Sequence, residues 1–227
     1  MEHRTIHRTS EENKQLVLHT AAKLFLKKGY TATTLRQIAK EADVNIGSLM
    51  YIYANKESLL CDLVDFVLKG QFAAARRLLD GKTKDDLLFW ATETMLQLYI
   101  AESSEHIREL YLAAYSHSKS AALIYQAIAE KMQIYFKVFY PEYEIKDFYE
   151  LEIATGGIIR GFMSVPCDMY FTMRRKVRRY LETAFLVYKV PEEKIQEAIN
   201  FVSTIDFETA APQVIEYLLA VLDKQTI

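Results

Sequence analysis

One short stretch near the amino-terminal end of the chain carries residue types that suit contact with a nucleic acid. Ser48 can hydrogen-bond a base edge or a phosphate, and Gly47 beside it permits close approach of the backbone. Ile46 and Met50 are placed to touch thymine methyl groups, and Tyr51 offers a hydroxyl to the phosphate backbone. For these groups to act together, they must lie on one face of a helix that stands clear of its own core.

The surrounding residues predict two short helices joined by a tight turn. Thr34 can cap the first helix with Gln37 as its reciprocal partner, Asp43 lies at the turn, and Asn45 can cap the second helix. The residues expected to close the small core between the two helices are Ile38, Ala39, Ala42, Val44 and Leu49. This spacing is typical of a helix-turn-helix, whose second helix enters a DNA major groove about 12 Å wide. The alternative interpretation is an ordinary helical hairpin inside a core.

Composition narrows the fold class and the compartment. The chain has 227 residues, 51% hydrophobic and 26% charged, with only seven Gly and four Pro, too few turn formers for a sandwich or barrel. Its apolar runs are shorter than a membrane span, and its first residues lack the apolar core of a signal peptide. Two cysteines, Cys61 and Cys167, are too few for a disulfide framework and indicate a reduced, cytoplasmic protein.

Charge divides the chain into two parts. Residues 1–56 carry nine Lys and Arg against five Asp and Glu, a net charge of 9 − 5 = +4. The remainder carries 28 − 9 = 19 against 30 − 5 = 25, a net charge of −6. A basic head on an acidic body indicates that the head is the part that meets an anionic partner; chance is the alternative explanation.

Nearly every segment has the apolar period of a helix, which predicts an all-α fold. The helices expected outside the helix-turn-helix cover residues 10–28, 55–79, 84–101, 104–117, 120–139, 146–165, 168–188, 191–203 and 207–222. No repeat or Gly/Ser tether is present, so a continuous helix starting near Asn55 should join the head to the body. We therefore expect a DNA-binding domain in residues 1–54 and a helical ligand-binding and dimerisation domain in residues 55–227.

The head resembles the TetR family of one-component transcriptional regulators over about residues 11–60. The matching residues are Ala21-Ala22-Lys-Leu-Phe25, Gly29-Tyr30, Thr33-Thr34-Leu35, Ile38-Ala39, Val44, Gly47-Ser48-Leu49 and Lys56-Glu57-Ser-Leu59. The chain departs from the family pattern at Asp43, where Gly is usual, and at Met50, where Tyr is usual. Asp tolerates the left-handed conformation better than most residues, whereas Met50 removes a hydroxyl that often meets phosphate.

The resemblance implies roles for particular residues of the head. Thr34 and Arg36 would lie near the DNA backbone or a groove edge. The reading helix would be lined by Asn45, Ile46, Gly47, Ser48 and Tyr51. The Lys56 ammonium, with the free N–H groups at the start of the next helix, would hold a phosphate; the alternative is a solvated lysine. Arg4 and Arg8 would either reach a minor groove or belong to a disordered arm.

The resemblance also implies a homodimer whose two heads meet a palindromic operator. The helices expected to form the dimer contact are 146–165 and 207–222. Three glycines inside the former (Gly156, Gly157 and Gly161) should mark either close packing at that contact or the wall of a ligand cavity.

In this family the helical body binds a small effector that releases the protein from DNA. The aromatic candidates for such a cavity are Trp90, Tyr99, Tyr111, Tyr115, Phe136 and Phe162; plain core packing is the alternative for each of them.

We therefore expect a sequence-specific transcriptional regulator, a repressor relieved by a small molecule. The alternative is an activator or co-regulator whose body binds a protein or peptide. No cofactor, metal site, membrane association or enzymatic activity is expected, because the chain lacks a P-loop, a dinucleotide fingerprint, a Gly-x-Ser-x-Gly motif and zinc-spaced cysteines. The basic cluster at 174–179 should be a solvated face paired with acids such as Glu182, and His3 and His7 should be idle.

Overall fold

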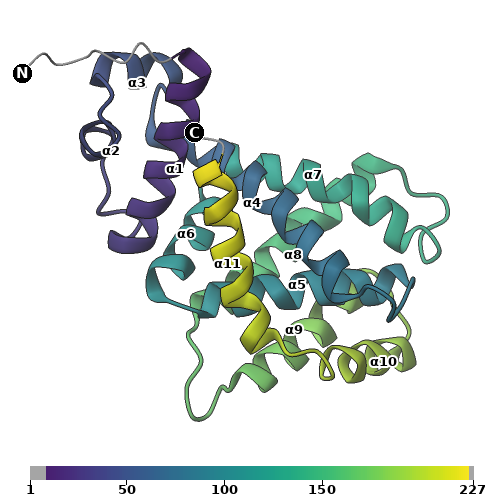
Figure 1. The fold of residues 1–227 in the computed structure, drawn as a ribbon. Helices are drawn as coiled ribbons and strands as arrows, with labels where there is room; N and C mark the ends of the chain where they lie inside the picture. The colour runs from purple at the N-terminus through teal and green to yellow at the C-terminus, as the bar shows by residue number, and fades with distance from the viewer. Residues whose placement is uncertain (1–8, 225–227) are drawn as a thin grey trace, which may run out of the picture.

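The computed structural model describes residues 9–224, and this part of the chain folds into α-helices without a β-strand (Figure 1). In chain order the helices are α1 (Ser10–Lys28), α2 (Leu35–Glu41), α3 (Ile46–Ile52), α4 (Lys56–Leu78), α5 (Asp86–Glu102), α6 (Glu105–Ser116), α7 (Ser118–Phe136), α8 (Ile145–Ser164), α9 (Met173–Val187), α10 (Glu192–Val202) and α11 (Phe207–Lys224). Every helix in this range is too short or too polar to cross a membrane. The predicted all-α class is confirmed.

Local hydrogen bonds determine where the helices of the head begin and end. Gln37 N donates to Thr34 Oγ1 over 3.3 Å and Thr34 N donates to Gln37 Oε1 over 2.8 Å, so the predicted capping box is confirmed. Asn45 Oδ1 accepts from Gly47 N over 2.7 Å and caps α3. Asp43 has a φ of 50°, the left-handed conformation that the turn requires.

One continuous helix, α4, joins the head to the body, as the lack of a linker predicts (Figure 1). Leu59 and Leu60 are buried near its first turn, and Leu68 and Phe72 are buried further along. A Cβ at Gly70 would collide with the Leu218 side chain of α11, so α4 and α11 approach each other closely there. Because α4 is one continuous helix, a shift of its body end would also move its head end.

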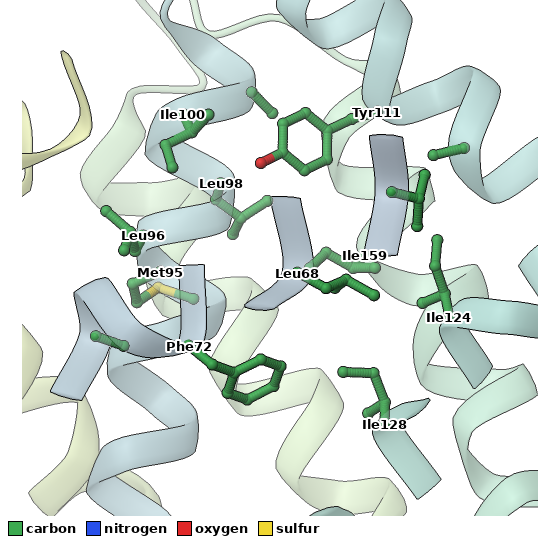
Figure 2. Close-up of a cluster of buried hydrophobic side chains, with 14 of the residues drawn as sticks. Leu68, Phe72, Met95, Leu96, Leu98, Ile100, Tyr111, Ile124, Ile128 and Ile159 are labelled. Carbon is green, nitrogen blue, oxygen red and sulfur yellow. The ribbon is translucent and has the colours of Figure 1, made fainter. Parts of the chain in front are cut away.

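The centre of the body is α5, which is buried on nearly all of its faces. It packs against α4, α6, α7, α8, α9, α10 and α11. Figure 2 shows Met95, Leu96 and Leu98 of α5 beside Leu68 and Phe72 of α4. A helix that is apolar all round is stable only when it is enclosed in this way.

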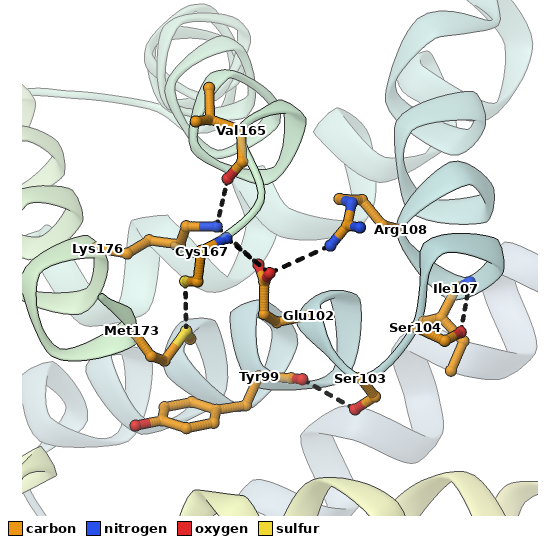
Figure 3. Close-up of polar contacts among 10 residues, drawn as sticks. All are labelled: Tyr99, Glu102, Ser103, Ser104, Ile107, Arg108, Val165, Cys167, Met173 and Lys176. Atoms are coloured by element: carbon orange, nitrogen blue, oxygen red, sulfur yellow. Dashed lines mark hydrogen bonds and ion pairs between the residues drawn. The ribbon is translucent and has the colours of Figure 1, made fainter. Parts of the chain in front are cut away.

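The end of α5 carries a partly buried ionic network (Figure 3). The Glu102 carboxylate accepts from Lys176 Nζ over 2.7 Å, from Cys167 N over 2.8 Å and from Arg108 Nη1 over 3.2 Å. Lys176 is 0% exposed and also donates to Val165 O over 2.6 Å. This network ties α9 to α5 and α6.

The basic cluster at 174–179 is therefore divided between the interior and the surface. Arg178 and Arg179 pair with Glu182, as the interpretation of a solvated face predicts. Lys176 instead points inward, and the sequence of the basic cluster did not predict a buried lysine. The cluster does not form one uniform basic surface.

One expectation about the later helices needs correction. The helix predicted from residue 168 begins at Met173, because the Asp168 carboxylate accepts from the N–H groups of Tyr170 and Phe171 and forms a turn instead. The two helices expected to form the dimer contact, α8 and α11, both pack on α5. α8 also packs on α6, α7 and α9, and α11 also packs on α1 and α4. Their part in a dimer contact stays a prediction.

Candidate functional site

The outer face of α3 is open to solvent. Tyr51 is 89% exposed, Met50 is more than half exposed, and Ile46, Gly47 and Ser48 are exposed as well. Leu49, on the opposite side of the helix, is 0% exposed and closes the core of the head. The predicted reading residues therefore share one accessible face, held by a buried anchor.

Thr34, Arg36 and Asn45 lie beside this face, and they differ in whether their side chains already have hydrogen-bond partners. The side-chain oxygens of Thr34 and Asn45 already accept hydrogen bonds from backbone N–H groups. They support the helix ends next to the surface. Arg36 on α2 is exposed, and its guanidinium makes no hydrogen bond or ion pair within residues 9–224. It is therefore available to an anionic partner.

Lys56 holds the loop between α1 and α2. Its Nζ donates to Tyr30 O over 2.8 Å, to Thr33 O over 3.0 Å and to Thr31 O over 3.5 Å, and it lies 4.2 Å from the centroid of the Tyr30 ring. Burial lowers the pKa of the Lys56 ammonium, and the nearby Glu109 carboxylate opposes part of that shift. The predicted phosphate contact stays a prediction, but all three N–H donors of the ammonium already have partners.

Glu109 of α6 connects the same loop to the body. Its carboxylate accepts from Thr31 N over 2.8 Å and from Tyr30 N over 3.0 Å. Partial burial pushes the pKa of Glu109 upward, but these hydrogen bonds outweigh it and leave the pKa below its ordinary value. Close by, His106 Nδ1 lies 3.0 Å from Leu26 O of α1. Sequence reasoning missed this clamp, because its partners are nearly 80 positions apart.

An apolar cavity of about 100 Å³ lies at the junction of head and body. Its walls come from α1, α4, α5, α6, α7 and α11, and its lining has no charged residue. The lining comprises Ala22, Leu26, Leu60, Leu63, Val64, Phe66, Val67, Leu68, Gln71, Gln97, Ile100, Ile107, Leu110, Tyr111, Ala114, Tyr115, Ile124, Ile215, Leu218, Leu219 and Leu222. The helices that carry the head and the core of the body thus share one cavity.

Two polar side chains in this lining have unused hydrogen-bonding groups. The Tyr111 hydroxyl and both amide atoms of Gln71 are buried, and they form no hydrogen bond of good geometry with any described residue, although the two side chains lie near each other. Figure 2 shows the Tyr111 hydroxyl among aliphatic side chains. Unsatisfied buried polar groups are rare in folded proteins, so they mark this cavity as a place where a ligand can bind.

The predicted aromatic residues are divided among several environments. Tyr111 and Tyr115 line the apolar cavity, and Trp90 lines a smaller neighbouring cavity that also includes Tyr115. Tyr99 lines a separate, more polar pocket with Arg174 and Arg178 of α9, whereas Phe136 and Phe162 line neither of the first two cavities. Tyr99, Phe136 and Phe162 stack or pack edge-on against Phe207, Tyr188 and Tyr180, respectively.

The cavities also contain residues that sequence analysis did not select. These are Gln71 and Gln97 in the apolar cavity, and Glu93 and Glu152 in the smaller one. The sequence feature that could have pointed to these residues is a polar side chain within an otherwise apolar helix. Arg4, Arg8, His3 and His7 lie outside the described residues. Within residues 9–224, no group of three His, Cys, Asp or Glu side chains is arranged to hold a metal ion.

Comparison with known proteins agrees with this geometry. A family described as "Bacterial regulatory proteins, tetR family" matches residues 17–63. The probable HTH-type transcriptional regulator YttP of Bacillus subtilis is 33% identical over 189 residues, which cover 79% of this chain and 84% of YttP. The HTH-type transcriptional repressor KstR2 of Mycobacterium tuberculosis is 25% identical over 70% of this chain and 72% of KstR2.

Other relatives match over 57 to 96 residues, and there the chain spans between 20% and 32% of their length. Among solved structures, SmeT, the repressor of the Stenotrophomonas maltophilia multidrug efflux pump SmeDEF, superposes with a TM-score of 0.55 at 16% identity and covers 83% of this chain and 93% of SmeT. That likeness concerns the fold alone. With the helix-turn-helix match and the long alignment to YttP, the chain belongs to the TetR family of bacterial transcriptional regulators.

Proposed function

We propose that this regulator is a homodimeric repressor that binds a palindromic operator and is released from it by a small molecule bound at the junction of head and body. The observation that carries the proposal is the shared cavity. α1 of the head contributes to its wall, as do α4, α6 and α11 of the body. An occupant of this cavity would therefore change how the head sits on the body. The name of the relative KstR2, a repressor, supports the direction of control.

DNA recognition is assigned to the open face of α3 and the edge of α2. Ser48 and Gly47 would meet base edges, Ile46 and Met50 would contact thymine methyl groups, and Tyr51 would reach the backbone. Phosphates would be held by Arg36, with Thr34 and Asn45 fixing the neighbouring helix ends. Lys56 would act through the loop that it holds, while the free backbone N–H groups at the start of α4 would face a phosphate.

The clamp at Glu109 provides a physical route from the cavity to the DNA. Ile107, Leu110 and Tyr111 of α6 line the cavity, and Glu109 of the same helix holds the N–H groups of Thr31 and Tyr30. A displacement of α6 by a ligand would pull on the loop that precedes α2. Binding would then favour a head orientation that no longer fits the operator.

A second copy of the chain is assigned to the open face of α8. Along this face Ile153, Gly157 and Gly161 are exposed, and a Cβ at either glycine would meet nothing within 4 Å. The adjacent α9 exposes Leu186. Gly156, by contrast, packs against the Tyr125 ring of α7, so it serves the core. Close helix approach across small residues suits a symmetric contact between two copies.

The proposal places the protein in the cytoplasm, where it meets the chromosome. An activator whose body binds a peptide would need an exposed apolar groove, whereas the cavity here lies between helices. The test is a selection of bound duplexes by the purified protein from fragmented bacterial DNA, followed by titration of the selected duplex. An inverted repeat should be enriched, and its affinity should fall steeply with salt. Failure to enrich any duplex would refute the assignment.

A further inference from the structure

Two carboxylates lie in the core of the body without a basic partner. Glu93 of α5 is 3% exposed and Glu152 of α8 is 6% exposed. Neither forms an ion pair within residues 9–224; the nearby Lys131 ammonium instead lies 4.4 Å from the centroid of the Phe72 ring. A buried acid is paired with a base, bound to a cation or kept protonated. This pair has no base beside it, so a cation that binds here would meet no competing positive partner.

The two acids differ in how far their oxygens are satisfied. Glu152 Oε2 accepts from Thr155 Oγ1 over 2.8 Å and from the Tyr188 hydroxyl over 3.3 Å. Glu93 forms no side-chain hydrogen bond with any described residue. Both acids line a cavity of about 20 Å³. That volume suffices for one group of the size of a water molecule, and a primary ammonium is such a group, with three donors to offer.

The other walls of this small cavity are aromatic. Trp90, Tyr115 and Tyr180 line it, and the rings of Trp90 and Tyr180 stack with centroids 6.2 Å apart. The faces of aromatic rings attract cations, and this attraction is strongest for Trp. Carboxylates together with aromatic faces select a cation over an anion or a neutral group.

The small cavity adjoins the apolar cavity described above. Gln97 and Tyr115 line both, and Gln97 Nε2 donates to the Tyr115 hydroxyl over 3.0 Å. Resting on the function proposed above, we propose that the effector is a primary amine with an apolar tail. Its ammonium binds Glu93 and Glu152, and its tail extends past Gln97 and Tyr115 into the apolar cavity.

Proton release should accompany binding. Burial raises the pKa of Glu93 to about 8 and that of Glu152 to about 7, so the empty pocket retains protons near neutral pH. Lys131 opposes the shift of Glu93, and the Thr155 and Tyr188 hydroxyls oppose that of Glu152. A bound ammonium favours the ionised carboxylates and displaces a proton, so affinity should rise as pH increases through this range.

The test compares three probes of equal length on the full-length protein by calorimetry: octylammonium, 1-octanol and octanoate. Octylammonium should bind about tenfold more tightly than octanol, and octanoate should bind most weakly. Glu93→Gln and Glu152→Gln, which keep the side-chain shape, should each weaken octylammonium by about tenfold and leave octanol unchanged. Glu150→Gln, at an exposed acid of α8, is the matched control and should change neither.

Octanol binding verifies that each variant keeps a folded cavity. Titrations in two buffers of different ionisation enthalpy should show proton release with octylammonium and none with octanol. Equal affinities for octylammonium and octanol, a preference for octanoate, or unchanged octylammonium binding by both Gln variants would overturn the amine site. Such a result leaves the selected operator intact, whereas a failed duplex selection beside normal octylammonium binding would refute the regulator and not the site.

Discussion

Substituting Glu93 by Gln tests the burial of this acid independently of any ligand. In the folded protein Glu93 has its pKa raised from 4.5 to about 8, chiefly by burial and secondly by the Glu152 charge. The folded state therefore holds a proton that the unfolded chain loses at lower pH. The free energy of unfolding therefore falls as pH rises from 4.5 toward about 8, because the unfolded chain loses this proton first. Above about 8 the full destabilisation by the buried, ionised acid is present.

The magnitude follows from the two pKa values. Between pH 6 and pH 9 the linkage relation assigns Glu93 a loss of about 3 kcal/mol in the free energy of unfolding. A glutamine side chain cannot titrate, so the E93Q variant should lack this loss and be the more stable protein at pH 9. Glu152, with a pKa raised to about 7, should add a smaller loss of about 1 kcal/mol over the same range.

The assay is urea denaturation followed by circular dichroism at pH 6, 7.5 and 9, with equal protein concentrations because a dimer's stability depends on concentration. Histidines and cysteines that titrate in this window contribute equally to both proteins and cancel in the difference. Glu150→Gln serves as the control and should follow the wild type. If E93Q and the wild type lose the same free energy between pH 6 and pH 9, Glu93 does not titrate there and the reasoning from burial is wrong.

Three further predictions concern the head and the contact between copies. Lys56→Met removes three hydrogen bonds from the loop after α1 and should destabilise the protein by about 1–3 kcal/mol in urea denaturation, weakening all duplexes alike in filter binding. Ser48→Ala should change which duplex is preferred in the selection and leave stability unchanged, because the side chain is exposed. Gly157→Arg should convert the dimer to a monomer in sedimentation experiments, because it places a charge on the open face of α8.

Each of these has a control. Lys40→Met, an exposed lysine on α2, should leave stability unchanged where Lys56→Met does not. A preferred sequence that Ser48→Ala leaves untouched would exclude Ser48 from base reading. Ala122→Arg, on an exposed position of α7, should remain dimeric; dimers of Gly157→Arg would place the contact elsewhere.

Local features of the fold could be predicted from the sequence because they depend on neighbours in the chain. The capping box of Thr34 and Gln37, the cap at Asn45 and the left-handed Asp43 each involve residues no more than three positions apart. The open face of α3 could also be predicted, because Leu49 is the apolar anchor of this short helix and the residues on the other side must face solvent. The resemblance to a known family then predicted the fold of the whole head from these local features.

Which charged side chains are buried depends on which faces of the helices meet. Glu102 and Lys176 are 74 positions apart, and the clamp from Glu109 to Thr31 spans 78 positions. No local pattern distinguishes a buried Lys176 from the exposed arginines around it, or an inward Glu93 from a solvated acid. Their burial depends on the packing of α5 against its neighbours.

The sequence by itself determined the helical class, the helix-turn-helix and its exposed reading face, since hydrogen bonds and apolar period act over a few residues. Only the tertiary structure decided that Tyr111 and Tyr115 line the apolar cavity while Phe136 and Phe162 pack against other aromatic rings. It also decided that Lys56 holds a loop and that two acids share an aromatic pocket. The physical reason is that burial and electrostatic environment belong to contacts between distant segments, which form only when the helices assemble.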